Sequence, residues 1–249
     1  MRPFGLGLRP ELSKIEGFST LADLGDLELW LDPKDLSTVW QDLAGTVPAL
    51  VGDPVLRIDD KSGNGNAVTK LGGAVTGSLV DSLANGDNMI LQPAGLGLNA
   101  LVQGAILAPY TIFAVVAHTT PLDDYQVLFD SRSALNRNVL QWETSVPAWR
   151  HYVGPSPIAT IPVTTGEPFD VLAMRIGVGN TSGLWVNGVY QGTAWTDTTV
   201  EFADLTLGYD YNFFGGSLLI GGLGDFAVYR NMAAVDMPVA SAEIGARWA

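Results

Sequence analysis

The alternation of apolar and polar residues predicts β-strands along most of the chain. Residues 169–176 are typical of a strand, 177–183 (GVGNTSG) are a dense cluster of turn formers, and 184–186 predict a second strand. Asn187-Gly188 then predicts a type I′ hairpin turn, because both central positions of that turn need φ > 0. Residues 189–192 should run back as a third strand. This meander favours sheet formation and carries no reactive side chain.

The middle of the chain repeats the pattern. Residues 110–118 form an almost continuous apolar run of strand formers, as expected for a central strand of a sandwich. Further strands are predicted at 27–32, 127–130, 138–143 and 148–153, separated by Gly-, Pro- and Asn-containing turns. Short strands at regular spacing, without βαβ alternation or a repeat, indicate an all-β sandwich or barrel.

A series of short motifs narrows the fold class. In chain order they are LWLD (29–32), STVWQD (37–42), GDPV (52–55), DDKSGNGN (59–66), LWVNG (184–188), LTLG (205–208) and GDFAVYR (224–230). Together they resemble laminin-G-like domains of the concanavalin A-like lectin/glucanase superfamily. The resemblance implies a jelly-roll β-sandwich of two antiparallel sheets over 27–249, ending in a short helix at 238–248. Such domains are frequent in phage virion proteins and in bacterial adhesion or carbohydrate-binding proteins.

Residues 1–26 differ from this pattern and predict a separate N-terminal arm. Pro and Gly residues break regular structure there, and apolar residues are frequent: Phe4, Leu6, Leu8, Leu12, Ile15 and Phe18. We expect an extended assembly arm that docks on a partner; the alternative is a disordered terminus. The predicted domain division is therefore 1–26 for the arm and 27–249 for the sandwich.

Composition limits the partners. The net charge of −13 disfavours nucleic acid, which carries the same sign. Hydrophobic residues make up 47% of the chain, charged residues only 16%, and mean hydropathy is +0.22. This predicts contact with other subunits, either virion proteins or copies of the chain in a homo-oligomer; a larger core is the alternative. No apolar run suits a membrane span or a signal peptide, so we expect synthesis in the host cytoplasm.

The segment DKSGNG (60–65) opens like a calcium loop, with oxygen-bearing side chains at alternate positions. Leu71 occupies the twelfth position, where an EF-hand loop needs a bidentate Glu. The favoured interpretation is an Asx-rich turn in which Asp60 and Asn64 cap backbone N–H groups and the glycines adopt φ > 0. Calcium bound by Asp59 or Asp60 with distant partners is the remaining alternative. No other cofactor is expected, since the chain has no cysteine and two histidines.

The sequence contains no recognisable arrangement of catalytic residues, so we expect a protein that is not an enzyme. Glycoside hydrolysis needs two carboxyl groups about 5–9.5 Å apart. The strand-spaced pattern Glu-x-Asp-x-x-Glu of the glucanase relatives does not occur, and neither does a Gly-x-Ser-x-Gly elbow.

Aromatic residues are the remaining candidates for ligand or interface contacts. One set falls in a predicted hairpin and a second in one glycine-bounded loop: Trp142, Trp149 and Tyr152; Tyr209, Tyr211, Phe213 and Phe214. Such side chains stack on sugars or anchor protein interfaces, and burial in the core is the alternative.

The leading hypothesis is a non-enzymatic structural or display protein of a phage-like particle, such as a capsid decoration, head-fibre or tail-associated subunit. The resemblance supplies this virion context, and contact with host surface polysaccharide is compatible with it. The second hypothesis is a carbohydrate-binding adhesion module unconnected with a virion. A polysaccharide-cleaving enzyme is the third and is disfavoured.

Overall fold

A computed structural model describes most of the chain. The described residues are 24, 26–70, 77–81, 88–92, 98–100, 106–118, 126–132, 137–143, 148–153, 156–162, 169–178, 182–191, 201–208 and 221–248. The predicted assembly arm (Phe4, Leu6, Leu8, Ile15, Phe18) lies outside them, as does the predicted aromatic loop (Tyr209, Tyr211, Phe213, Phe214).

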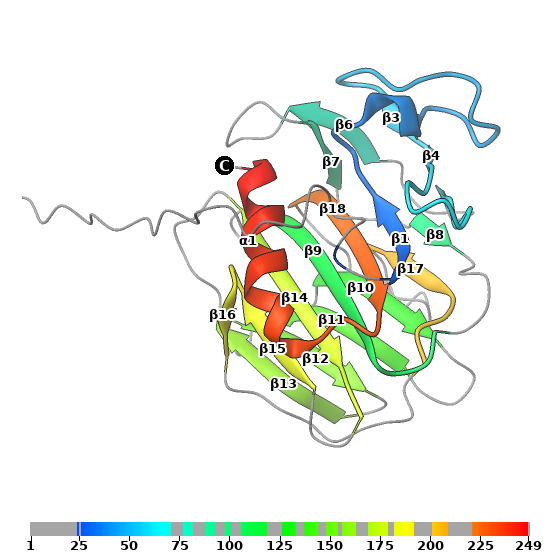
Figure 1. Ribbon diagram of the computed structural model, residues 1–249. Coiled ribbons are helices and arrows are strands. Elements are labelled where there is room, and N and C mark those ends of the chain that lie inside the picture. The colour runs from blue at the N-terminus through cyan, green and yellow to red at the C-terminus, as the bar shows by residue number, and fades with distance from the viewer. Residues whose placement is uncertain are drawn as a thin grey trace, which may run out of the picture.

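Two antiparallel sheets form the molecule (Figure 1). The first sheet has the order β16-β15-β14-β9-β18-β7-β6-β3, and β1 also pairs with β18. Its strands are β1 (Asp26–Leu31), β3 (Pro54–Val55), β6 (Gly77–Asp81), β7 (Asn88–Gln92), β9 (Tyr110–His118), β14 (Asp170–Ile176), β15 (Gly183–Val186), β16 (Val189–Tyr190) and β18 (Gly221–Arg230).

The second sheet has the order β13-β12-β11-β10-β17-β8-β5-β4-β2. Its strands are β2 (Val39–Trp40), β4 (Arg57–Ile58), β5 (Val68–Lys70), β8 (Leu98–Ala100), β10 (Gln126–Arg132), β11 (Arg137–Glu143), β12 (Ala148–Val153), β13 (Ser156–Pro162) and β17 (Leu205–Leu207). The jelly-roll sandwich of two antiparallel sheets predicted from the sequence is confirmed.

The main core fills the space between the two sheets. The apolar run predicted to be a central strand is β9, which pairs with β14 and β18 in the middle of the first sheet. Aromatic rings from the two sheets meet in this core, since Phe129 of β10 lies 5.9 Å from Phe226 of β18 between ring centroids. The remaining space is filled largely by branched aliphatic side chains.

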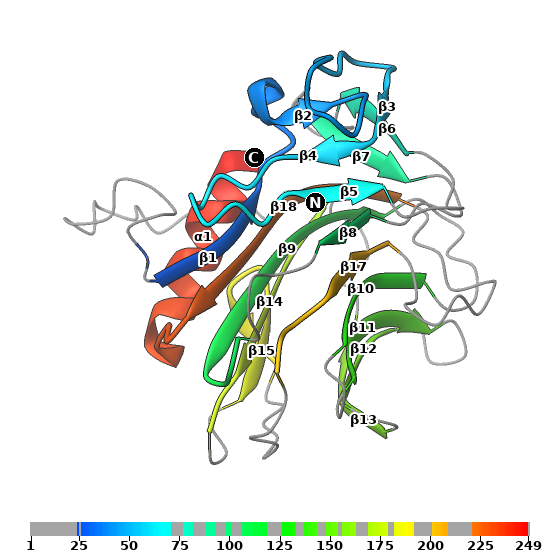
Figure 2. The ribbon, with the colours of Figure 1, turned by 90° about the vertical axis from the view of Figure 1, so that its right-hand side faces the viewer.

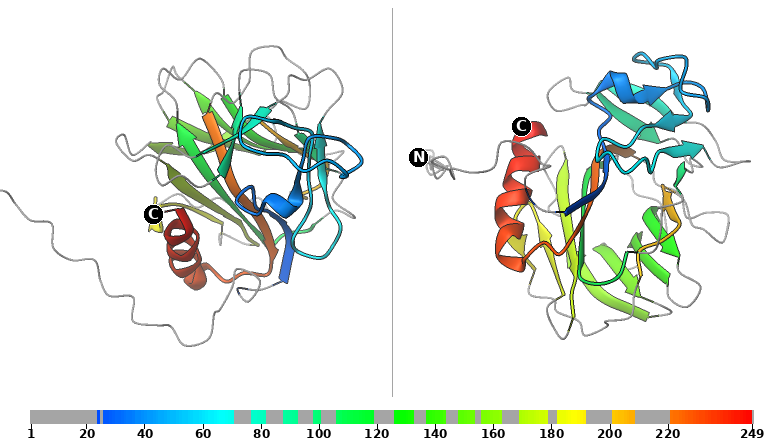
Figure 3. Two further views of the ribbon diagram at one scale, coloured as in Figure 1. Left: turned by 90° about the horizontal axis from the view of Figure 1, so that it is seen from above. Right: turned by 45° about the vertical axis from the view of Figure 1, so that its right-hand side comes forward.

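A second apolar layer covers the outer face of the first sheet. The C-terminal helix α1 (Met237–Trp248) lies across this face, so that helix, first sheet and second sheet form three layers (Figure 2; Figure 3, right). Ala240, Ile244 and Trp248 of the helix pack with outward residues of the sheet such as Phe113 and Ala173. The short helix predicted at 238–248 is confirmed.

The hairpin that dominates the sequence pattern forms as predicted. β14 pairs with β15, and β15 pairs with β16, through a turn in which Asn187 has φ 50° and Gly188 has φ 78°. The Asn187 side chain accepts a hydrogen bond from the Val171 amide and donates one to Asp170, both 2.8 Å long. This Asn therefore fixes the turn to the neighbouring strand. Among the described residues, no helix is both long and apolar enough to cross a bilayer.

Candidate functional site

The strand register defines a polar outer face on the second sheet, the face turned away from the first sheet. Trp149 belongs to the inter-sheet core, and His151, two residues further, is fully buried on the same side. Because successive strand residues alternate between faces, Arg150 and Tyr152 lie on the outer face. Both side chains are half-buried.

Cross-strand pairing extends this outer face in one row across the sheet. Tyr152 pairs with Val139, Val139 with Asp130, and Asp130 with Thr206. Residues opposite one another in a ladder share a face, so all four lie together. The row continues through the register partners Asn99, Thr69, Arg57 and Trp40. A single line of residues thus runs from β12 to β2 and is mostly polar.

The next row supplies further hydrogen-bonding groups. Gln141 of β11 pairs with Arg150 of β12, and both are half-buried. Asp130 and Thr206 in the middle of the face are fully buried. The Thr206 hydroxyl has no hydrogen-bond partner in the described part of the chain. On β11 and β12, the half-buried groups of this face are the Tyr152 ring, the Arg150 guanidinium and the Gln141 amide, a combination suited to a polyhydroxylated ligand. The buried Asp130 and Thr206 offer no open surface.

The predicted aromatic hairpin exists, but its members differ in position. Trp142 pairs with Trp149 across β11 and β12, so the expected pairing of these strands is confirmed. Trp149 is only 1% exposed and packs in the core, so the alternative of core burial holds for this residue. It offers no surface to a ligand. Tyr152 is the aromatic residue of this hairpin that lies on the outer face with a half-buried side chain.

The predicted turn around Asp60 forms, and the carboxylate caps backbone groups. Asp60 accepts hydrogen bonds from the amides of Trp30, Ser62 and Asn66 at 2.8–3.0 Å. Gly63 and Gly65 have φ of 90° and 76°, as an Asx-rich turn requires. Asn64, predicted to cap amides as well, instead donates its side-chain amide to the carbonyls of Leu27 and Glu28 at 3.0 and 3.1 Å.

Asp59 is engaged separately from this turn. One of its oxygens accepts from the Trp40 indole N–H at 2.8 Å and the other pairs with Arg57 at 2.6 Å. Within the described residues, no cluster of three or more acidic or histidine side chains is arranged to hold a metal ion. Calcium at Asp59 or Asp60 stays the less favoured alternative.

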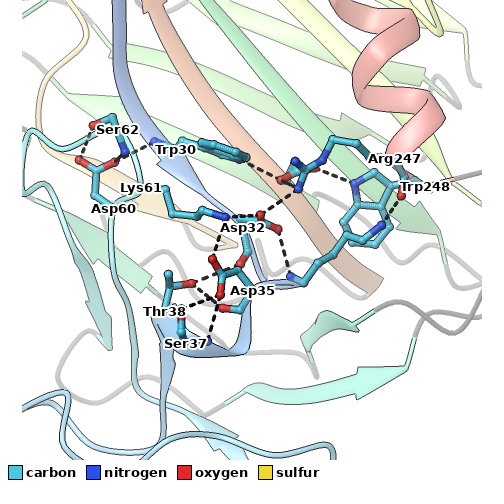
Figure 4. Close-up of polar contacts among 12 residues, drawn as sticks. Trp30, Asp32, Asp35, Ser37, Thr38, Asp60, Lys61, Ser62, Arg247 and Trp248 are labelled. Carbon is cyan, nitrogen blue, oxygen red and sulfur yellow. Dashed lines mark hydrogen bonds and ion pairs between the residues drawn. The ribbon is translucent and has the colours of Figure 1, made fainter. Parts of the chain in front are cut away.

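A second polar cluster lies where the C-terminal helix meets the first sheet (Figure 4). Its centre is Asp225 of β18, which is 1% exposed. The indole N–H groups of Trp30 and Trp248 donate to its two oxygens at 3.1 and 2.8 Å, and Arg247 Nε donates at 3.0 Å. All these partners are donors, so they satisfy the ionised carboxylate. Burial, together with the negative charge of Asp32, raises the pKa of Asp225.

Asp32 extends the cluster toward the N-terminal part of the domain. It accepts from Arg247 Nη2 and from Lys61 Nζ, both at 2.9 Å. Lys61 also bonds Asp35 at 2.8 Å, and this contact, with the Ser37 hydroxyl, lowers the pKa of Asp35 to about 2. The cluster thus joins β1, β18 and the end of α1. Because Asp225, Trp248 and Asp32 are buried, it anchors the helix and offers no open site for a substrate.

Exposed large apolar side chains concentrate in one segment near the start of the domain. Five of the ten in the described residues lie within 36–51: Leu36, Leu43, Val47, Leu50 and Val51. Hydrogen bonds hold this segment in shape, since Asp42 caps Thr46 and Val47, and Arg57 donates to the carbonyls of Leu43 and Ala44. The segment therefore presents apolar side chains on an ordered scaffold.

Sequence reasoning missed most of the outer-face residues. Gln141, Arg150 and Asp130 are separated in sequence and belong to no motif. What they share in the sequence is strand alternation: each directly follows a core residue on its own strand and therefore lies on the opposite face. Tyr190, the exposed aromatic side chain on β16, was also missed, although its place just after Asn-Gly marks it as an edge residue.

The sequence matched no family model, and a search of curated proteins also found no match. Solved structures do match the fold. Domain 4 of AbnA, a GH43 extracellular arabinanase from Geobacillus stearothermophilus solved with arabinotriose, is similar over 88% of this chain and 98% of its own length, with TM-score 0.62 and 16% identity.

Two further similar structures are larger proteins. Trypanosoma rangeli sialidase in complex with sialic acid matches 88% of this chain with TM-score 0.58 and 10% identity. The binding domain of botulinum neurotoxin serotype D/C matches 90% with TM-score 0.60 and 9% identity. The chain spans 33% and 53% of their respective lengths. These likenesses show the fold alone.

Proposed function

We propose that this protein is a non-catalytic carbohydrate-binding β-sandwich whose sugar site is the outer face of the second sheet around Tyr152. The observation that carries the proposal is the pairing of β11 with β12, which places the half-buried side chains of Tyr152, Arg150 and Gln141 together on the outer face. Sugars stack their apolar faces on aromatic rings and exchange hydrogen bonds with carboxylate, amide and guanidinium groups. The similar AbnA domain was solved with arabinotriose, which supports testing arabino-oligosaccharides among the first ligands.

The spacing of acidic residues supports a binding rather than a cleaving role. On β10, β11, β12 and β17, as far as these strands are described, Asp130 and Glu143 occupy the acidic outer-face positions. Asp130 pairs with Val139, four residues before Glu143. Four residues of strand span about 13 Å, beyond the 5–9.5 Å that glycoside hydrolysis uses. We therefore assign no catalytic pair to this face.

A glycan array followed by calorimetry tests the proposal, with Tyr152→Ala as the site variant. Loss of ring stacking should weaken binding by about 10-fold or more, equivalent to about 1.4 kcal/mol. Tyr190→Ala is the matched control, since Tyr190 lies on the first sheet and is 47% exposed. It should bind like the unaltered protein. An array without any bound glycan, or loss of binding in Tyr190→Ala alone, would refute the assignment.

We also propose that the sandwich is displayed on a larger assembly, such as a phage-like particle. The observation that favours this is the ordered apolar segment 36–51, which is suited to contact with another subunit. The expected arm, residues 1–26, is the second predicted contact. Light scattering of the full chain and of a chain lacking 1–26 tests this role. A defined oligomer that dissociates on truncation supports an assembly arm, and monomers in both cases count against it.

A further inference from the structure

We infer that the apolar segment 36–51 is the docking site for residues 2–9 of a second copy of this chain. This inference rests on the proposed assembly role and names the partner that the segment binds. The docking site is argued from its described contacts and exposure, and the occupant from its sequence.

Two turns give the docking site a fixed shape. They span 42–45 and 50–53, and a backbone hydrogen bond closes each of them at 3.4 and 2.9 Å. The Gln41 side chain reaches the second turn by donating to the Asp53 carboxylate at 3.1 Å. A backbone hydrogen bond of 2.7 Å to the Leu79 carbonyl holds the same turn to β6. A surface that is already ordered loses little conformational entropy when a partner binds.

The segment carries apolar side chains that are exposed in the isolated chain. Leu43, Val47, Leu50 and Val51 have exposed fractions between 46 and 63%. The segment forms the blue loops at one end of the sandwich, next to β3 and β6 (Figure 1). A second molecule can therefore cover these side chains.

The pattern of residues 2–9 fits such a surface. Phe4, Leu6 and Leu8 alternate with glycines, so an extended conformation on binding would place three apolar side chains on one side, about 6–7 Å apart. Glycine at the intervening positions allows the backbone to approach the partner closely. Residues 10–23 can span up to about 45 Å when extended, which is enough to reach a neighbouring molecule.

Charge complementarity favours this occupant over an apolar peptide without charge. Residues 2–9 contain two arginines and no carboxylate, although the whole chain has a net charge of −13. Residues 36–53 contain Asp42 and Asp53 and no lysine, arginine or histidine. Arg57 also reaches this segment, but a carboxylate pairs with it at 2.6 Å. Two copies of so acidic a chain repel each other, and contact between oppositely charged segments offsets part of that repulsion.

Light scattering of full-length chains tests the contact by complementation. Phe4→Asp disables the arm and Leu50→Asp disables the segment, so each change alone should raise the dissociation constant about 30-fold or more. In an equimolar mixture, the arm of the Leu50→Asp chain can dock on the intact segment of the Phe4→Asp chain. The mixture should therefore form a heterodimer at a concentration at which each variant alone is monomeric.

A second comparison tests the role of charge. Arg9→Gln should weaken self-association by up to about 5-fold, the effect of one partly exposed ion pair, and the difference should shrink in about 1 M salt. Lys14→Gln is the matched control, since it changes the net charge equally but lies outside residues 2–9. It should associate like the unaltered chain. Circular dichroism verifies that every variant is folded.

The outcomes separate this inference from the proposed function. An unaltered chain that oligomerises, with variants that fail to complement each other, would overturn the pairing of arm and segment and leave the assembly role standing. Unchanged association of either Phe4→Asp or Leu50→Asp would also overturn the pairing. A monomeric unaltered chain would overturn the pairing and count against assembly as well. Glycan binding around Tyr152 is measured independently on the array.

Discussion

Gly224 lies directly beneath the indole ring of Trp248, the last described residue of the chain. A Cβ atom at Gly224 would stand 2.6 Å from Cζ2 of Trp248 and 3.0 Å from Cβ of Val115. Neither neighbour is the free end of a flexible side chain, since Trp248 is fully buried and also held by Asp225. The absence of a side chain at this strand position therefore allows the C-terminal helix to dock.

Replacing Gly224 by alanine should displace the helix end. Overpacking of a buried site costs about 1–3 kcal/mol, so we expect Gly224→Ala to lower the free energy of unfolding by that amount. Denaturant unfolding measures it. Gly245→Ala, on the helix itself, is the matched control: its Cβ would make an ordinary 3.7 Å contact with Val171. Alanine is the better helix former, so this variant should gain about 0.5–1 kcal/mol. Equal stability of the two variants would contradict the predicted clash.

Asp225→Asn should destabilise the protein more strongly. The amide would place an NH₂ group against donors from Trp30, Trp248 and Arg247, and it would leave Arg247 with one carboxylate instead of two. Breaking a buried ion pair from one side costs about 3–5 kcal/mol. Arg230→Gln, which removes a more exposed pair with Glu28, should cost less than about 1 kcal/mol. Thermal and denaturant unfolding of the two variants should differ accordingly; similar costs would show that the cluster does not anchor the helix.

His151 should make stability depend on pH above the range in which carboxylates titrate. Burial lowers the pKa of His151 to about 3, against 6.5 in an unfolded chain. Below pH 6.5 the unfolded chain takes up a proton that the folded chain does not accept, so the unfolding free energy falls as pH falls. The slope from this group approaches about 1.4 kcal/mol per pH unit. Denaturant unfolding between about pH 7 and 5 measures it.

His151→Gln is the corresponding control, because glutamine keeps a donor for Asn138, which in turn donates to Tyr110 at 2.7 Å. The variant should be less stable at neutral pH but should lose the part of the slope that His151 contributes. If the variant and the unaltered protein show the same slope, the imidazole titrates alike in both states and the prediction is wrong.

Calcium addition should leave the thermal midpoint unchanged. Both oxygens of Asp60 already accept hydrogen bonds from within the turn, and both oxygens of Asp59 are engaged by Trp40 and Arg57. Asp60→Ala should instead lower stability by about 1–3 kcal/mol through loss of the backbone caps. Calorimetric scans with calcium and with a chelator test this prediction. A calcium-dependent rise in the thermal midpoint that Asp60→Ala abolishes would instead establish the metal site.

Leu50→Asp should weaken any association that uses the segment 36–51. Leu50 is 63% exposed, so a charge there should leave the fold intact while making an apolar contact unfavourable. Val235→Asp is the control, since Val235 is 79% exposed on the 3-10 helix Ala234–Asp236. Light scattering should then report a lower mass for Leu50→Asp alone. An unchanged oligomer would exclude this segment from the contact.

Much of the fold could be predicted because its signals are local. The apolar run 110–118 has apolar residues on both faces of a strand, so both faces had to be buried. Asn and Gly adopt positive φ with little strain, so Asn187-Gly188 indicated a turn. The Asx turn at Asp60 was predictable for the same reason, since its carboxylate caps amides only two and six residues away.

The candidate site could not be predicted in the same way, because it depends on register between distant strands. Trp149 and Tyr152 look equivalent in sequence, yet alternation turns one into the core and the other onto the outer face. A shift of one residue in pairing would have exchanged them. Likewise, the local sequence Gly-Asp-Phe does not indicate that Asp225 will accept a hydrogen bond from the indole N–H of Trp248.

The sequence by itself therefore determined many of the strands and turns and the all-β class, since these follow from side-chain periodicity and backbone preference, while the jelly-roll class followed from the resemblance of its motifs. Only the tertiary structure decided which residues share a surface. The pairing of β10, β11, β12 and β17 brings Asp130, Val139, Tyr152 and Thr206 into one row, and docking of α1 closes Arg247 and Trp248 over Asp225. Both depend on contacts between distant segments, whose geometry is fixed by packing of the whole core.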